Sequence, residues 1–165
     1  MFGKTLGEYL SFQKAVLILI ALVWAVRLGL SLAGVPDATG KYVRITAVLV
    51  ATAFYYPWSL HQSGFGSFKQ LYALSLIQGV FSQTLVALAI VLAIFTGHDN
   101  IFTVPEFYPP SSGGGAMMPV DGKNFAHAGA HIFFAGAILL PLVVWLVGSV
   151  VLFVLRKASP RPARG

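Results

Sequence analysis

The sequence has no cysteine and few charged residues. Without cysteine the chain forms no disulfide, no cysteine-ligated zinc site and no iron–sulfur cluster. Charged residues make up 10% of the 165 residues and hydrophobic residues 57%, whereas roughly a quarter of the residues are charged in an ordinary soluble domain. The mean hydropathy is +0.80. These values exclude a soluble globular domain and indicate an integral membrane protein.

The long apolar segments contain no acidic residue. The whole chain carries a net charge of +6. In a soluble protein that charge would suggest nucleic acid as a partner. In a chain this apolar, the expected partner of lysine and arginine is the anionic lipid headgroup. A proton-coupled exporter is disfavoured, because no carboxylate lies in the membrane segments to carry the proton. We therefore expect membrane lipids as partners and no nucleic acid.

Four apolar segments predict an all-α integral membrane protein, with an antiparallel bundle of four transmembrane helices in a single domain. The third segment runs for 28 residues without a charge and the fourth for 24, more than the roughly 20 that a bilayer requires. Pro141 predicts a kink in the fourth helix rather than a break. The predicted parts are helices at about 15–35, 42–60, 70–97 and 125–155, an outer loop at 97–124 and a basic tail at 156–165.

The distribution of lysine and arginine predicts a protein of the cytoplasmic (inner) membrane with both termini in the cytoplasm. In that orientation seven of these residues lie on the cytoplasmic side and three on the outer side, as the positive-inside rule requires. A cleavable signal peptide is the competing interpretation of the first segment, because an apolar run of 12 residues follows a polar start. Apolar residues resume after Arg27, so a membrane helix is favoured.

Small residues at helical spacing predict where the helices pack, because they let backbones approach closely in lipid. The first helix has such a residue at every fourth position, and we expect this series to pack against the second helix. The third helix has a similar seam, which we expect to face the fourth helix. The predicted packing residues are Ala21, Ala25, Gly29, Ala33, Ser75 and Gly79.

Three polar residues of the third helix, Gln78, Ser82 and Gln83, are costly in lipid unless they bond to a neighbouring helix. Interhelical hydrogen bonds are the favoured interpretation. The alternative is a polar cavity for a small solute.

Arg27 is charged and lies inside a predicted span, about seven residues from its outer end and so roughly 10 Å deep. At 100° per residue it lies about 200° from Ala25, so we expect it to point away from the small-residue series. The favoured interpretation is that the side chain extends to the outer headgroups. A salt bridge is the second interpretation and a transport role the third. The candidate partners for a salt bridge are Asp99, Glu106 and Asp121.

His127 and His131 form a candidate metal site, because a spacing of four places both imidazoles on one face of a helix. A more specific alternative is a haem coordinated by His98 on one side and by His127 or His131 on the other. The small residues around the pair favour a simpler interpretation, in which the histidines are polar residues of a packed interface. The candidates for a third metal ligand, all on the same outer side, are His98, Asp99, Glu106 and Asp121.

The sequence contains no paired carboxylates, Ser–His–Asp pattern or HExxH motif, so we do not expect an enzyme. We predict an accessory or scaffold subunit of a larger membrane complex, bound to other membrane subunits or to copies of itself. This hypothesis depends on Arg27 pointing away from the predicted packing face, and on a long outer loop that needs a surface to rest on. The alternatives are a haem- or metal-binding membrane protein, for electron transfer or metal handling, and a facilitator for a small solute or lipid.

Overall fold

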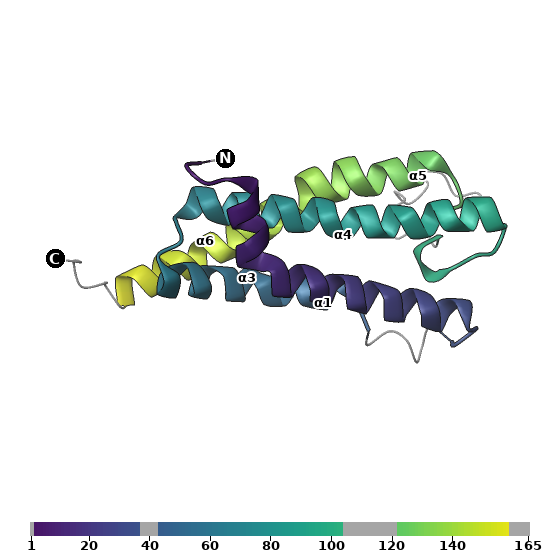
Figure 1. Cartoon of the computed structure of the whole chain (residues 1–165), viewed down its shortest axis with the longest axis horizontal. Coiled ribbons are helices and arrows are strands. Elements are labelled where there is room, and N and C mark those ends of the chain that lie inside the picture. The colour runs from purple at the N-terminus through teal and green to yellow at the C-terminus, as the bar shows by residue number, and fades with distance from the viewer. Residues whose placement is uncertain (1, 37–42, 104–121, 159–165) are drawn as a thin grey trace, which may run out of the picture.

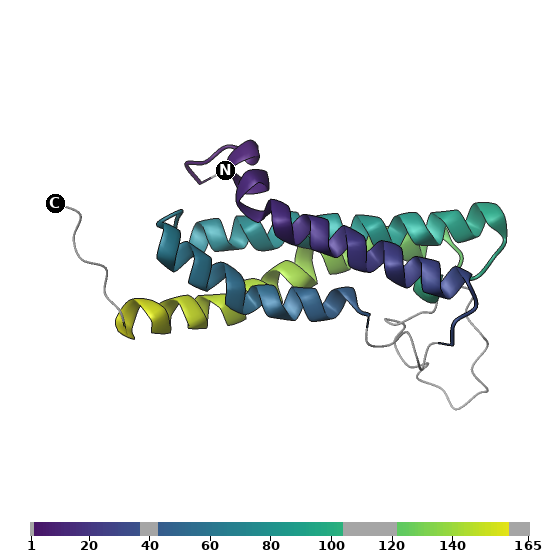
Figure 2. The same ribbon diagram turned by 60° about the horizontal axis from the view of Figure 1, so that its bottom comes forward.

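The computed structural model describes residues 2–36, 43–103 and 122–158, and every regular element in these ranges is helical. The long helices alternate in direction: α1 and α4 run one way, and α3 and α5–α6 run the other (Figures 1 and 2). α5, η2 and α6 follow one another without a break. The elements are α1 (Leu6–Leu32), α3 (Ile45–Ser63), α4 (Phe68–Thr96), the 3₁₀ helix η1 (Ile101–Thr103), α5 (Phe125–Ala130), the π-helical η2 (His131–Leu139) and α6 (Leu140–Ala158).

Three helices are long and apolar enough to cross a bilayer: α1, α4 and the continuous helix Phe125–Ala158. The helical, membrane-capable character predicted from composition is therefore confirmed. α3, which was predicted as a fourth span, is not among the three. It has 19 residues, about 28 Å at 1.5 Å per residue, and Pro57 and His61 in its second half lower its hydropathy.

Reciprocal capping bonds start α1 and α4 earlier than predicted. Thr5 Oγ1 accepts the backbone N–H of Glu8 at 3.2 Å, and a Glu8 carboxylate oxygen accepts the backbone N–H of Thr5 at 2.8 Å. At the start of α4, Gln70 Oε1 accepts the backbone N–H of Ser67 at 2.8 Å. Because such pairs satisfy backbone donors that have no partner within the helix, the two helices begin before residues 15 and 70.

The second and last helices also extend beyond their predicted ends. α3 continues past Pro57 to Ser63, and α6 continues to Ala158. Arg156 and Lys157 were predicted to lie in a tail, but they belong to the last turn of α6. Basic side chains favour that position because they interact with the negative end of the helix dipole. Residues 159–165 of the predicted tail lie outside the described residues.

α4 is the central helix, and it packs against α1, α3 and the α5–α6 helix. Figure 1 shows α4 between α5 and α1, while α6 passes behind α4 and ends beside α3. The buried core includes Ile20 of α1, Tyr56 of α3, and Leu74 and Ile90 of α4. Many apolar side chains on the outside of the bundle are exposed, with Phe95 at 78%. An exposed apolar surface of this kind suits lipid contact.

A close approach of backbones joins α4 to the π-helical segment at Gly79. A Cβ added at Gly79 would lie 2.5 Å from the carbonyl oxygen of Gly136 and 2.8 Å from Pro141 Cγ. Pro141 has no N–H to donate to the preceding turn, and just before it the N–H of Leu140 bonds to the carbonyl of Ala135, five residues back. The helix thus continues past Pro141 because its preceding turns are π-helical and wider. Only glycine fits at position 79, where α4 crosses this segment.

The small-residue series of α1 does not make the helix contact expected for it. Ala25, Gly29 and Ala33 are exposed, Ala21 is half-buried, and a Cβ added at Gly29 would meet nothing within 4 Å. The buried face of α1 contains two long polar side chains, which cost less when enclosed by protein than when exposed to lipid. This requirement sets the rotation of α1. The buried face consists of Tyr9, Gln13, Val16, Ile20, Arg27 and Leu28.

Candidate functional site

The two histidines of the α5–α6 helix lie face to face in the interior. His127 Nε2 and His131 Nε2 are 3.1 Å apart, and each residue is 8% exposed. His127 is in the first turn of α5, where Asn124 caps the helix by accepting the His127 backbone N–H at 2.7 Å. His131 follows one turn later, where the π-helical segment begins. The predicted spacing therefore places both imidazoles on the same buried face.

Each imidazole is held through its other ring nitrogen. His127 Nδ1 lies 2.8 Å from the backbone carbonyl oxygen of Gly122, and His131 Nδ1 lies 2.7 Å from Gln83 Oε1 on α4. A backbone carbonyl oxygen only accepts hydrogen bonds, so Nδ1 of His127 is protonated and donates to Gly122. With Gln83 Oε1 facing His131, Nδ1 of His131 donates in the same way. Metal-ligating histidines are typically held in this way, with Nδ1–H bonded to an oxygen and Nε2 left for the metal.

This arrangement determines what can lie between the rings. With both Nδ1 atoms donating, two neutral imidazoles present facing lone pairs at Nε2, which repel unless a proton or a cation lies between them. If the Gln83 amide is turned over, it donates to His131 Nδ1, and the His131 proton moves to Nε2. In both arrangements His127 Nε2 is unprotonated, because the Gly122 carbonyl fixes the proton on Nδ1. The pair is suited to hold one shared proton or one metal ion.

A short segment folds back from the end of α4 and reaches the residue that holds His127. The Asn100 side-chain amide donates to the carbonyl oxygen of Ala89 at 2.8 Å, and the backbone N–H of Ile101 donates to Ser31 Oγ at 2.9 Å. Thr103 in this segment lies directly against Gly122, the residue that holds His127. Figure 1 shows the segment curling back beneath the end of α4. The segment is thus fixed to α4 and α1 by hydrogen bonds and lies beside the backbone that holds His127.

Arg27 lies inside the fold rather than at the lipid surface, where the favoured interpretation placed it. It is 9% exposed and lines a pocket with Ser31, Asp99 and Asn100. Asp99, one of its predicted partners, pairs with Lys123 at 3.1 Å. Glu106 and Asp121, the other predicted partners, lie outside the described residues. Arg27 is therefore part of a polar group of residues at the end of the bundle where α1 ends and α5 begins.

His98 does not join the pair. It is exposed beyond the end of α4, and no third His, Cys, Asp or Glu groups with His127 and His131 within the ranges that the structure describes. A haem coordinated from both sides needs its two imidazoles on opposite faces of the porphyrin. The predicted haem would need His98 to face His127 or His131, whereas the two histidines that the structure brings face to face are His127 and His131, with their Nε2 atoms 3.1 Å apart.

The polar residues of α4 have separate roles. Gln78 donates through its side-chain amide to Thr52 Oγ1 of α3 at 2.8 Å, an interhelical bond of the kind expected. Ser82 donates to the carbonyl oxygen of Gly79 in its own helix at 3.0 Å. Gln83 alone of these three contacts a histidine. Gln83 is therefore the residue of α4 that serves the histidine pair.

A further interhelical bond was not anticipated from the sequence. Tyr56 of α3 donates from its hydroxyl to Gln13 Oε1 of α1 at 2.9 Å, and both side chains are fully buried. The predicted first span began at residue 15, which left Gln13 outside the membrane. The Thr5–Glu8 spacing is the signal that would have placed Gln13 within the helix.

Replacing Gln83 with leucine is expected to weaken metal binding at the histidine pair about tenfold, because the hydrogen bond that orients His131 is lost. Calorimetric titration of the purified variant with Zn²⁺ measures the change. Gln78→Leu is the matched control, since it removes a buried amide from the same helix without touching either histidine. Equal affinities for the two variants would show that Gln83 does not orient a metal ligand.

Comparison of the chain with protein-family models, with curated proteins and with solved structures finds no match.

Proposed function

We propose that this chain is a small four-span membrane protein that binds a divalent transition-metal ion between His127 and His131. The observation that carries the proposal is the pair of facing Nε2 atoms, each in a ring whose Nδ1 bonds to a carbonyl oxygen. Two nitrogens bound at tetrahedral angles to one Zn²⁺ ion are about 3.3 Å apart, and the two Nε2 atoms are 3.1 Å apart. The distance between the two nitrogens therefore fits two ligands of one ion.

The membrane placement of this proposal has two supports. α3 is close to the roughly 30 Å thickness of the hydrocarbon core and packs along α6, so we take it as the remaining span. The excess of lysine and arginine at the end where α1 begins and α6 ends favours the cytoplasm for both termini, in the inner membrane. The histidine pair then lies toward the outer side of the membrane.

The remaining coordination positions fall to water and to one carboxylate. We propose Asp121 for that carboxylate, because it directly precedes Gly122, whose carbonyl holds His127. Imidazole and carboxylate ligands together suit Zn²⁺ and other late first-row ions. Since the proposed orientation places the pair toward the outer side and the sequence carries no catalytic motif, the function we propose is metal handling.

The hypothesis of an accessory or scaffold subunit has less support. It depended on Arg27 facing away from the packing face of its own chain, and on the long outer loop predicted at 97–124, of which residues 104–121 lie outside the described residues. Arg27 is instead buried in a pocket of its own chain, against the segment that folds back from α4. The geometry of the histidine pair therefore favours metal binding.

The proposal is tested by titrating the purified full-length protein with Co²⁺, which occupies zinc-like sites and absorbs visible light. We expect one Co²⁺ per chain, displaced by Zn²⁺. Binding is expected to weaken as the pH is lowered, because an imidazole must be unprotonated to ligate a metal. A His98→Ala variant is the control and should bind as the wild type does. The absence of stoichiometric binding by the wild type would overturn the proposal.

A further inference from the structure

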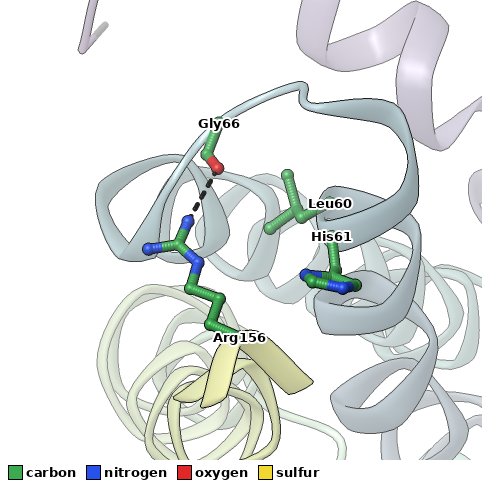
Figure 3. A pocket seen from close by; sticks show the side chains of 4 residues that line it. All are labelled: Leu60, His61, Gly66 and Arg156. Atoms are coloured by element: carbon green, nitrogen blue, oxygen red, sulfur yellow. Dashed lines mark hydrogen bonds between the residues drawn. The ribbon is translucent and has the colours of Figure 1, made fainter. Parts of the chain in front are cut away.

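A second pocket lies at the opposite end of the bundle from the histidine pair, where α3 and α6 both end. It is lined by Leu60, His61, Gly66 and Arg156. Figure 3 shows the Arg156 guanidinium and the His61 imidazole on facing sides of this pocket, one from α6 and the other from α3. None of the four lining residues is acidic. The pocket therefore presents basic groups without a carboxylate among them.

The Arg156 side chain is positioned rather than left free at the helix end. Its Nη2 donates to the carbonyl oxygen of Gly66 at 3.1 Å, and its guanidinium carbon lies 5.1 Å from the centre of the Phe68 ring. A guanidinium has five N–H donors, and this one makes a single hydrogen bond to the described residues. The remaining donors are available to an anion with several oxygens, such as a carboxylate or a phosphate, which arginine binds through two parallel hydrogen bonds.

The surroundings indicate where the anion would come from. Trp58, one turn before His61 on α3, is 53% exposed, and exposed tryptophan is typical of the headgroup level of a membrane. Lys157, the neighbour of Arg156 in the last turn of α6, adds a further positive charge at this end. Leu60 supplies an apolar wall to the pocket. Phosphate is the oxyanion that is common at this level of a membrane.

We infer that the pocket binds a phosphate group between Arg156 and His61. The group is carried either by an anionic phospholipid of the adjoining leaflet or by a small soluble phosphate. The guanidinium donates two hydrogen bonds to phosphate oxygens, and the imidazole, which makes no hydrogen bond to any described residue, donates a third. The inference is independent of the metal site, since the two sites share no residue.

The test uses the full-length protein in a neutral detergent, with the wild type, Arg156→Gln and Lys157→Gln compared by native mass spectrometry. One arm adds phosphatidylglycerol and a second adds inorganic phosphate. We expect Arg156→Gln to weaken binding of the probe about tenfold, and Lys157→Gln by less than about twofold. The control removes the same charge one residue away without changing the pocket.

The arm that responds to Arg156→Gln identifies the source of the phosphate, and either response supports the inference. If Arg156→Gln and Lys157→Gln bind both probes equally well, the inference is overturned. Should Arg156→Gln fail to fold, His61→Gln serves instead, since it gives up no hydrogen bond to the described residues. It is expected to weaken binding severalfold, and wild-type affinity in His61→Gln would overturn the inference.

Discussion

Replacing His131 with alanine is expected to weaken Co²⁺ or Zn²⁺ binding about 100-fold. The apparent free energy of a four-ligand structural zinc site is about 10–16 kcal/mol, so a single ligand accounts for about 3 kcal/mol, or roughly two orders of magnitude in affinity. His127→Ala should have an effect of similar size, because each ring supplies one Nε2 ligand and the two atoms are 3.1 Å apart. Titration of each variant with Co²⁺, followed by visible absorption, measures the loss.

The loss of a ligand must be separated from the loss of the fold. His131→Ala also removes the hydrogen-bond partner of the Gln83 side-chain amide, which lies 2.7 Å from His131 Nδ1, and an unsatisfied buried polar group costs about 1–3 kcal/mol. Thermal unfolding of the metal-free variants, followed by circular dichroism, measures that cost separately. A folded His131→Ala protein with wild-type affinity would show that the pair does not bind the ion, whereas His98→Ala should change neither quantity.

The histidine pair shows how far the sequence predicts the candidate site. Spacing alone places His127 and His131 on one helix face, because the helical repeat fixes the relative positions of residues four apart. The spacing does not predict which groups hold the two rings. Gln83 lies 48 residues from His131 in the chain, and Gly122 acts through its backbone carbonyl, which has no signature in a sequence.

The fold was predictable at the level of helices and less so at the level of contacts. Apolar runs reveal which segments are helices of membrane length, because the bilayer itself sets that length. A small-residue series only permits a close approach and does not say which helix makes it. Gly79 of α4 lies against Gly136, whereas Gly29 of α1, in the clearest series, meets no neighbour. Buried polar residues such as Gln13 decided the rotation of α1.

Replacing Gly79 with valine is expected to destabilise the protein by about 3 kcal/mol, the upper end of the usual cost of overpacking a core. The first added carbon would lie 2.5 Å from the Gly136 carbonyl oxygen and 2.8 Å from Pro141 Cγ. Backbone and a proline ring cannot move aside as a flexible side chain can, so α4 and the π-helical segment must separate. Chemical unfolding in detergent, followed by circular dichroism, measures the loss of free energy.

Gly29→Val is the matched control, because it makes the same change in another long helix at a position where a Cβ meets nothing within 4 Å. Its stability should match or slightly exceed that of the wild type, since valine has a somewhat higher helix propensity than glycine. Gly79→Val should also weaken metal binding, because the α4 contact that it breaks positions Gln83 against His131. Equal stability of the two variants would contradict the close crossing at Gly79. A destabilised Gly79→Val protein that keeps wild-type metal affinity would show that the crossing supports the fold without positioning the histidines.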